Sequence, residues 1–152
     1  MSNTDSRSIT KAVIPAAGFG TRLKPLTSIA PKEMLPLGRR PAVEYILEEL
    51  HASGVNDIIM VVSPRKSGIR DYFGDSACDG RVRMCYAIQE TQKGLADAIL
   101  MAEELVDGEP FVVALGDSVI TSRRETVPLE RLIRAFVSNP ACAAIGVESV
   151  PR

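Results

Sequence analysis

The chain has 152 residues, of which 45% are hydrophobic, and its 18 basic and 19 acidic residues leave a formal charge of −1. This length and apolar content suit one domain with a hydrophobic core and exclude an intrinsically disordered protein. The balanced charge does not indicate a nucleic-acid or membrane partner, and no apolar run approaches the roughly 20 residues that span a bilayer.

The first ten residues, MSNTDSRSIT, are polar and lack the apolar core of a signal peptide. We therefore expect a disordered tail over residues 1–10 and one folded domain over residues 11–152. The three cysteines are an odd number without CxxC spacing, which predicts buried, reduced thiols and a cytoplasmic location. They are Cys78, Cys85 and Cys142.

Short apolar runs alternate with helical patterns along the chain. The expected strands cover residues 12–17, 57–62, 82–88, 111–115 and 141–147, and the expected helices cover residues 41–53, 67–73, 95–106 and 125–138. This alternation predicts an α/β fold with a Rossmann-like, mostly parallel sheet and helices on both faces. Ligands of such sheets bind beyond the carboxyl ends of the strands. The loops that follow strands are therefore the candidate functional segments.

Apolar residues recur at helical spacing in two of these helices, and we expect both stripes to face the sheet. The stripe of the first helix consists of Val43, Ile46, Leu47 and Leu50, and that of the third consists of Leu95, Ala98, Ala102 and Leu105. Two polar helical residues, Asp97 and the lone histidine His51, are expected at the surface.

The first loop after a strand begins Gly-Phe-Gly-Thr-Arg at residues 18–22 and continues through Pro25, Pro31 and Pro36. Glycines let backbone N–H groups approach a ligand closely, and phosphate is the usual ligand of such a row of donors. Between residues 11 and 40 only one acid, Glu33, stands against six basic residues, which indicates a small anionic ligand. The six are Lys11, Arg22, Lys24, Lys32, Arg39 and Arg40.

Two well-known phosphate loops do not fit this segment. A dinucleotide-binding fingerprint needs a third glycine and a helix that opens directly from the turn, which the three prolines prevent. A P-loop needs a terminal Gly-Lys-Ser/Thr, which is missing.

The stretch PAAGFGTRLKPLT, followed by PKEMLPL, resembles the double signature of the sugar-phosphate nucleotidyltransferases, and the resemblance runs from Lys11 to Pro151. It is strongest to members that use glucose 1-phosphate. The resemblance implies nucleotidyl transfer from UTP to a sugar 1-phosphate, giving a UDP-sugar and pyrophosphate, with Mg²⁺ as the cofactor. A thymidylyl-transferring enzyme that uses dTTP stays open, because the later motif Leu115-Gly116-Asp117 suits both groups.

Nucleotidyl transfer is an in-line displacement that depends on positioning and charge neutralisation. Arg22 is the candidate clamp for the triphosphate, because a guanidinium can hold two phosphate oxygens. Lys32 would place a point charge near the α-phosphate or the sugar phosphate. Asp117, at the end of a buried strand, matches the family's metal ligand, although an Asp here could also cap the next element.

The resemblance also assigns a nucleotide-binding set. In it Gln89 and Gly94 would read the base, because an amide offers both a donor and an acceptor, and Glu33 would lie near the base. Ordinary turn, core or loop roles stay open for these residues, with Ala16 and Ala17 equally well explained as core alanines. The full set is Ala16, Ala17, Gly18, Gly20, Thr21, Glu33, Gln89 and Gly94.

The chain ends soon after the last expected strand, with no helix to cover it, and members of the family are longer. We therefore expect a sheet that is incomplete on its C-terminal side, with exposed apolar surface that favours self-association into a homo-oligomer. A non-catalytic nucleotide-binding module is accordingly a further functional hypothesis.

Overall fold

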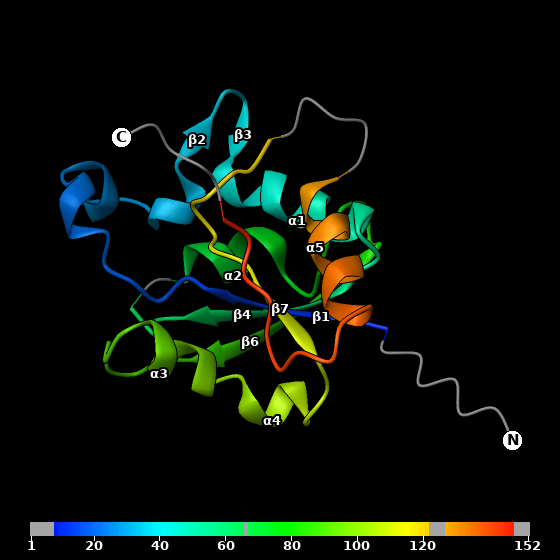
Figure 1. Ribbon diagram of the computed structural model, residues 1–152. Helices are drawn as coiled ribbons and strands as arrows, with labels where there is room; N and C mark the ends of the chain where they lie inside the picture. The colour runs from blue at the N-terminus through cyan, green and yellow to red at the C-terminus, as the bar shows by residue number, and fades with distance from the viewer. Residues whose placement is uncertain (1–7, 66, 122–126, 148–152) are drawn as a thin grey trace, which may run out of the picture.

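A computed structural model describes residues 8–65, 67–121 and 127–147. Its main sheet has five strands in the order β5–β6–β4–β1–β7 (Figure 1). All neighbours pair in parallel except β5, which is antiparallel to β6. The strands are β1 (Lys11–Pro15), β4 (Asp57–Val62), β5 (Ser76–Ala77), β6 (Val82–Ile88) and β7 (Phe111–Val113). The predicted Rossmann-like, mostly parallel sheet is confirmed.

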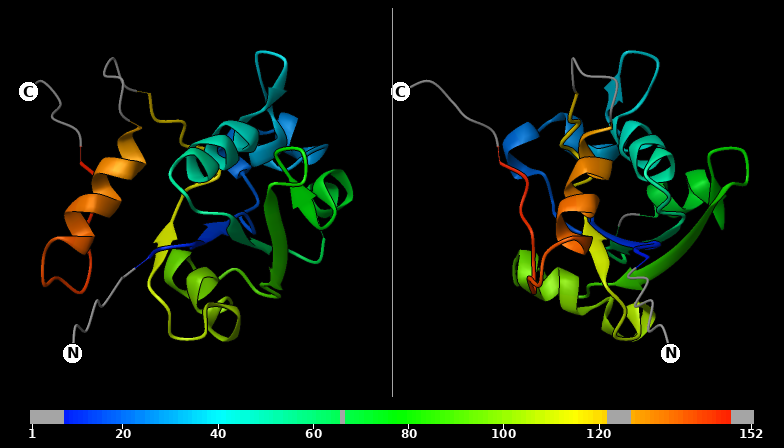
Figure 2. Two further views of the ribbon diagram at one scale, coloured as in Figure 1. Left: turned by 90° about the vertical axis from the view of Figure 1, so that its right-hand side faces the viewer. Right: turned by 45° about the vertical axis from the view of Figure 1, so that its right-hand side comes forward.

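Helices cover both faces of this sheet (Figures 1 and 2). One face carries α1 (Ala42–Ala52), α2 (Gly68–Phe73) and α5 (Pro128–Val137), and the other carries α3 (Leu95–Leu100) and α4 (Glu103–Val106). Between β1 and α1 lie three short 3-10 turns and a hairpin. These are Thr21–Leu23, Leu26–Ser28 and Lys32–Met34, then β2 (Pro36–Leu37) and β3 (Arg40–Pro41).

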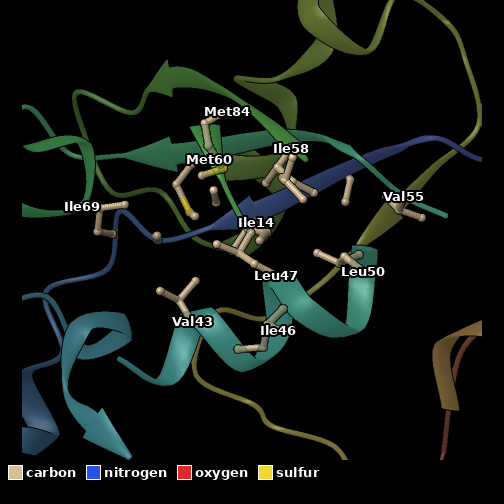
Figure 3. Close-up of a cluster of buried hydrophobic side chains, with 14 of the residues drawn as sticks. Ile14, Val43, Ile46, Leu47, Leu50, Val55, Ile58, Met60, Ile69 and Met84 are labelled. Carbon is tan, nitrogen blue, oxygen red and sulfur yellow. The ribbon is translucent and has the colours of Figure 1, made fainter. Parts of the chain in front are cut away.

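The larger core lies between the sheet and α1 (Figure 3). The run DIIMVV of β4 is buried from Ile58 onward on both sides of the strand, as expected for a central parallel strand. All four residues of the α1 stripe, from Val43 to Leu50, are buried as predicted. Helix α1 ends before Gly54, whose positive φ of 83° is a backbone conformation that glycine adopts without strain.

The helix predicted over residues 95–106 is divided into α3 and α4, and the prediction of its inward face is wrong in part. Leu95 and Leu105 are 52% and 41% exposed, whereas Ala98, Ala102 and Val106 are buried against Val13 and the inner face of β4. These three follow a strict i, i+4, i+8 spacing. Two alanines on the inward line let the helical segment lie close to the strands, so the larger leucines are left outside.

The strand predicted over residues 141–147 is not formed. This segment runs beside α5 as irregular chain (Figures 1 and 2), and Ile145 and Val147 are 82% and 90% exposed. An apolar run becomes a strand only when a sheet edge accepts its backbone hydrogen bonds. The edge strand β7 contributes three residue pairs, all to β1.

Other predictions concern the ends of elements and the cysteines. Of the tail predicted over residues 1–10, residues 1–7 lie outside the described residues, as does the helix start at residues 125–126. Within residues 8–10, Ile9 is buried and the Thr10 carbonyl accepts from the Asn56 and Asp57 N–H groups. All three cysteines are free thiols, but Cys142 is exposed and only the other two are half-buried, so the prediction of buried thiols is wrong for Cys142. In the described part of the chain, every helix is too short or too polar to cross a bilayer.

Leu47 should be central to stability, because its side chain is fully buried between α1 and the sheet. We expect Leu47→Ala to lower the free energy of unfolding by about 2–5 kcal/mol, measured by urea denaturation. The matched control is Leu100→Ala, whose side chain is 59% exposed and whose change should stay within about 1 kcal/mol. Similar losses for the two variants would contradict this packing.

Glu49 of α1 accepts a hydrogen bond from the backbone N–H of Leu129 at the start of α5 (3.2 Å). Burial raises the pKa of Glu49 above its ordinary value of 4.5, and the Leu129 N–H only partly offsets this. A carboxyl whose pKa is higher in the folded chain destabilises the fold once the pH exceeds its unfolded pKa. Glu49→Gln should therefore raise the unfolding free energy at about pH 7, and the gain should vanish below about pH 4. The matched control is Glu90→Gln, at an exposed position, and equal pH profiles of unfolding for the two variants would refute the assignment.

Candidate functional site

The glycine loop leaves the carboxyl end of β1, in the middle of the sheet. The Ala16 N–H still donates to the Val61 carbonyl (2.8 Å), and Ala16 and Ala17 are buried at 1% and 2% exposure. The arrowheads of β4 and β6 point to the same side of the molecule as this loop (Figure 1). The loops after β1 and β6 therefore meet at one edge of the sheet, as the parallel arrangement requires.

Thr27 closes the glycine loop on itself. Its hydroxyl donates to the Gly20 carbonyl (2.7 Å), and its side chain is buried. Gly20 has a positive φ of 61°, and a Cβ there would lie only 2.7 Å from Thr27 Cγ2. Sequence analysis included Thr27 in the motif PAAGFGTRLKPLT but gave it no role; its position at the end of that motif was the available signal.

Lys32 brings the glycine loop and the end of β7 together. Its side chain runs beside the two glycines, with Cε 4.0 Å from where a Gly18 Cβ would stand and Cβ 3.5 Å from where a Gly20 Cβ would stand. Its Nζ donates to Asp117 Oδ2 at 2.7 Å. The side chains of Lys32 and Asp117 are 26% and 39% exposed, so a ligand can reach both.

Glu33 lies behind this ion pair, inside the fold. Its side chain is fully buried, and Oε1 is 3.7 Å from Lys32 Nζ. A Cβ on Gly116 would stand 2.8 Å from Glu33 Cγ and 3.2 Å from Ile14 Cγ2. The glycine of the Leu-Gly-Asp motif thus makes room for Glu33, a packing role that sequence reasoning missed although the glycine itself was visible.

Gln89 and Gly94 come together in the loop between β6 and α3. Gln89 is 3% exposed, and its Nε2 donates to Asp97 Oδ2 (2.7 Å) and, at longer range, to the Gly94 carbonyl (3.4 Å). The expectation of a free surface position for Asp97 is wrong, because its carboxylate is half-buried and holds Gln89. Gln92 Nε2 donates to the Ala17 carbonyl (3.3 Å), which ties this loop to the glycine loop.

Arg22 and Thr21 begin the first 3-10 turn, directly after Gly20, and both are exposed. Within the described residues Arg22 forms no ion pair and no side-chain hydrogen bond, so its guanidinium is available to an anion. The structure therefore brings Gly18, Gly20, Lys32 and Asp117 into contact, whereas Arg22 lies beside them without touching the Lys32–Asp117 pair.

A cavity of about 410 Å³ lies elsewhere, between α1 and the α2–β5 region, and is lined by Arg40, His51 and Cys78 among others. His51 bonds Asn56 through Nδ1 (2.6 Å), away from the glycine loop. Within the described ranges, the structure contains no group of three or more histidine, cysteine, aspartate or glutamate side chains that could hold a metal ion.

Comparison with known proteins identifies the family of the chain. The family model described as "Nucleotidyl transferase" matches residues 11–152. UTP–glucose-1-phosphate uridylyltransferases of Mycoplasma pneumoniae and Staphylococcus haemolyticus are 40% and 35% identical over 94% and 95% of this chain. The match covers 55% and 56% of their lengths, so the chain spans about half the length of these relatives.

Two solved structures have the same fold. UDP-glucose pyrophosphorylase complexed with UDP-glucose is 30% identical with a TM-score of 0.77, over 86% of this chain and 54% of its own. The UTP-bound enzyme from Acinetobacter baumannii is 30% identical with a TM-score of 0.82, over 88% and 54%. With its family motifs joined at one edge of the sheet and the family model matched from residue 11 to the C-terminus, the chain belongs to the nucleotidyl transferase family.

Proposed function

We propose that this chain carries the nucleotide site of an enzyme that transfers a uridylyl group from UTP to glucose 1-phosphate and releases pyrophosphate. The ion pair of Lys32 with Asp117 carries the proposal, because it places a cation and a carboxylate beside the glycine loop. The names of the relatives and the UTP in the Acinetobacter structure support the choice of base.

In this mechanism the protein positions the reactants and neutralises charge. Backbone N–H groups around Gly18 and Gly20 face the phosphates, and Arg22 clamps the outer phosphate oxygens with its paired N–H groups. Lys32 turns from Asp117 toward the phosphate that is attacked and stabilises the charge that develops on it. The sugar phosphate oxygen attacks the α-phosphorus in line, and the bond to the leaving pyrophosphate breaks.

Asp117 would hold Mg²⁺ in this site, together with phosphate oxygens of the nucleotide. A single exposed carboxylate fits this ion, which is commonly bound by one or two carboxylates, substrate phosphates and water. When bound, Mg²⁺ would neutralise phosphate charge and orient the triphosphate. Asp117 can take this role because Lys32 holds only its Oδ2 atom.

Replacing Asp117 tests the proposal. Asp117→Asn should weaken UTP binding in the presence of Mg²⁺ by about tenfold or more, because the neutral amide is a poor ligand for this cation. Isothermal titration with UTP, dTTP, ATP and GTP, each with Mg²⁺ and with EDTA, measures the effect and the base preference. Asp107→Asn, at an exposed position that Asn also tolerates, is the matched control.

The unchanged chain should prefer UTP, and the loss in Asp117→Asn should disappear in EDTA. A preference for dTTP would instead identify a thymidylyl-transferring enzyme. Equal UTP affinity for Asp117→Asn and the unchanged chain in Mg²⁺ would rule out the proposed metal role.

Replacing Arg22 tests the phosphate clamp. Arg22→Ala should weaken UTP–Mg²⁺ binding by about tenfold yet change the unfolding free energy by no more than about 0.5 kcal/mol, because the side chain is exposed. Arg22→Lys should recover part of the affinity, since an ammonium cannot hold two oxygens in one plane. The control is Arg131→Ala, at an exposed position on α5. An equal loss of UTP affinity in both alanine variants would contradict the clamp, because the loss would then reflect only the lower positive charge of the chain.

A further inference from the structure

The amide of Gln89 is held in one orientation by its neighbours. Gln89 begins the loop after β6, where its N–H donates to the Val62 carbonyl (2.9 Å). Its Nε2 meets two oxygens, Asp97 Oδ2 at 2.7 Å and the Gly94 carbonyl at 3.4 Å. Of these bonds, the shorter one to a charged carboxylate is much the stronger.

Chemistry alone fixes which end of the amide faces Asp97. An ionised carboxylate and a backbone carbonyl can only accept hydrogen bonds, so the group between them must be the NH₂. A turned amide would place Oε1 against the Asp97 carboxylate and lose both bonds. With both N–H bonds used, Oε1 is the polar atom left for a ligand, and no group in the described parts of the chain donates to it.

The surrounding loop keeps this arrangement in place. Gly94 has φ 106° and ψ −178°, a conformation that residues with a side chain rarely adopt, and its carbonyl also accepts from the Ala98 N–H (3.1 Å) at the start of α3. Gln92 ties the loop to Ala17 of the glycine loop. Asp97 lies in the first turn of α3, so that helix positions the carboxylate behind Gln89.

We infer that Asp97 is a positioning residue for base selection, which fixes Gln89 as a pure hydrogen-bond acceptor. This inference rests on the proposed function. The ring N3–H of uracil or thymine can donate to such an acceptor, whereas the N3 of cytosine carries a lone pair and would oppose the Gln89 oxygen. Asp97 thereby selects bases with a ring N–H without touching the nucleotide.

The isosteric variant Asp97→Asn separates orientation from packing. An Asn side chain can offer either its oxygen or its NH₂ to Gln89, so the turned amide also finds a partner at residue 97 and is opposed only by the Gly94 carbonyl. Titration of the whole chain with UTP and with CTP in Mg²⁺ should then show the UTP-to-CTP affinity ratio falling by about tenfold. Asp97→Glu, which again can only accept, should restore much of the ratio. Thermal unfolding checks that each variant is folded, and Asp107→Asn is the distant control.

The outcomes distinguish a failure of the role inferred for Asp97 from a failure of the proposed function. A lower ratio in Asp97→Asn with recovery in Asp97→Glu supports the inference. An unchanged ratio, with both affinities reduced equally, would show that Asp97 serves packing alone and would overturn it while leaving the proposed function intact. If the unchanged chain binds neither UTP nor dTTP, the proposed function fails and the inference fails with it.

Discussion

Lys32 and Asp117 lie 85 residues apart in the chain, yet their side chains form an ion pair of 2.7 Å. The parallel pairing of β1 with β7 makes this contact possible, because it brings the carboxyl ends of both strands to the same edge of the sheet. β1 also pairs with β4, which in turn pairs with β6, so the loop that carries Gln89 reaches the same edge. The central position of β1 is the constraint on which the candidate site depends.

A buried carboxylate makes this edge costly to disturb. Glu33 is fully buried, and the Lys32 ammonium lies 3.7 Å from it as well as beside Asp117. Removing Lys32 would abolish both of these contacts at once, next to a carboxylate that is buried inside the fold. A substitution of Lys32 would therefore change folding and binding together. Asp117 and Arg22 are more exposed than Glu33, so substitutions at these two positions should change ligand binding with less effect on stability.

The sequence predicted the parts of this fold that depend on local pattern. The buried run of β4, the stripe of α1 and the general α/β order follow from hydrophobic periodicity, and the structure agrees with them. The strand over residues 141–147 failed because pairing depends on a distant edge, which composition cannot specify. The site shows the same division: Lys32, Asp117 and Gln89 were singled out one by one, but the burial of Glu33 and the bond from Gln89 to Asp97 require the folded chain.

The two ends of the candidate site, one around Gln89 and the other around Arg22 and Lys32, differ in how rigidly the protein holds their side chains. At the end proposed to bind the base, Gln89 is buried and its amide donates to Asp97, so little order would remain to be gained on binding. At the end proposed to bind phosphate, Arg22 is exposed and Lys32 is engaged with Asp117, so a nucleotide with its metal would have to replace an existing ion pair by new ones. Because exposed charges are screened by salt, the affinity for phosphate should depend on ionic strength far more than the discrimination between bases does. Under the proposed function, selectivity and binding strength would therefore reside in separate groups of residues, on two loops that the bond from Gln92 to Ala17 joins.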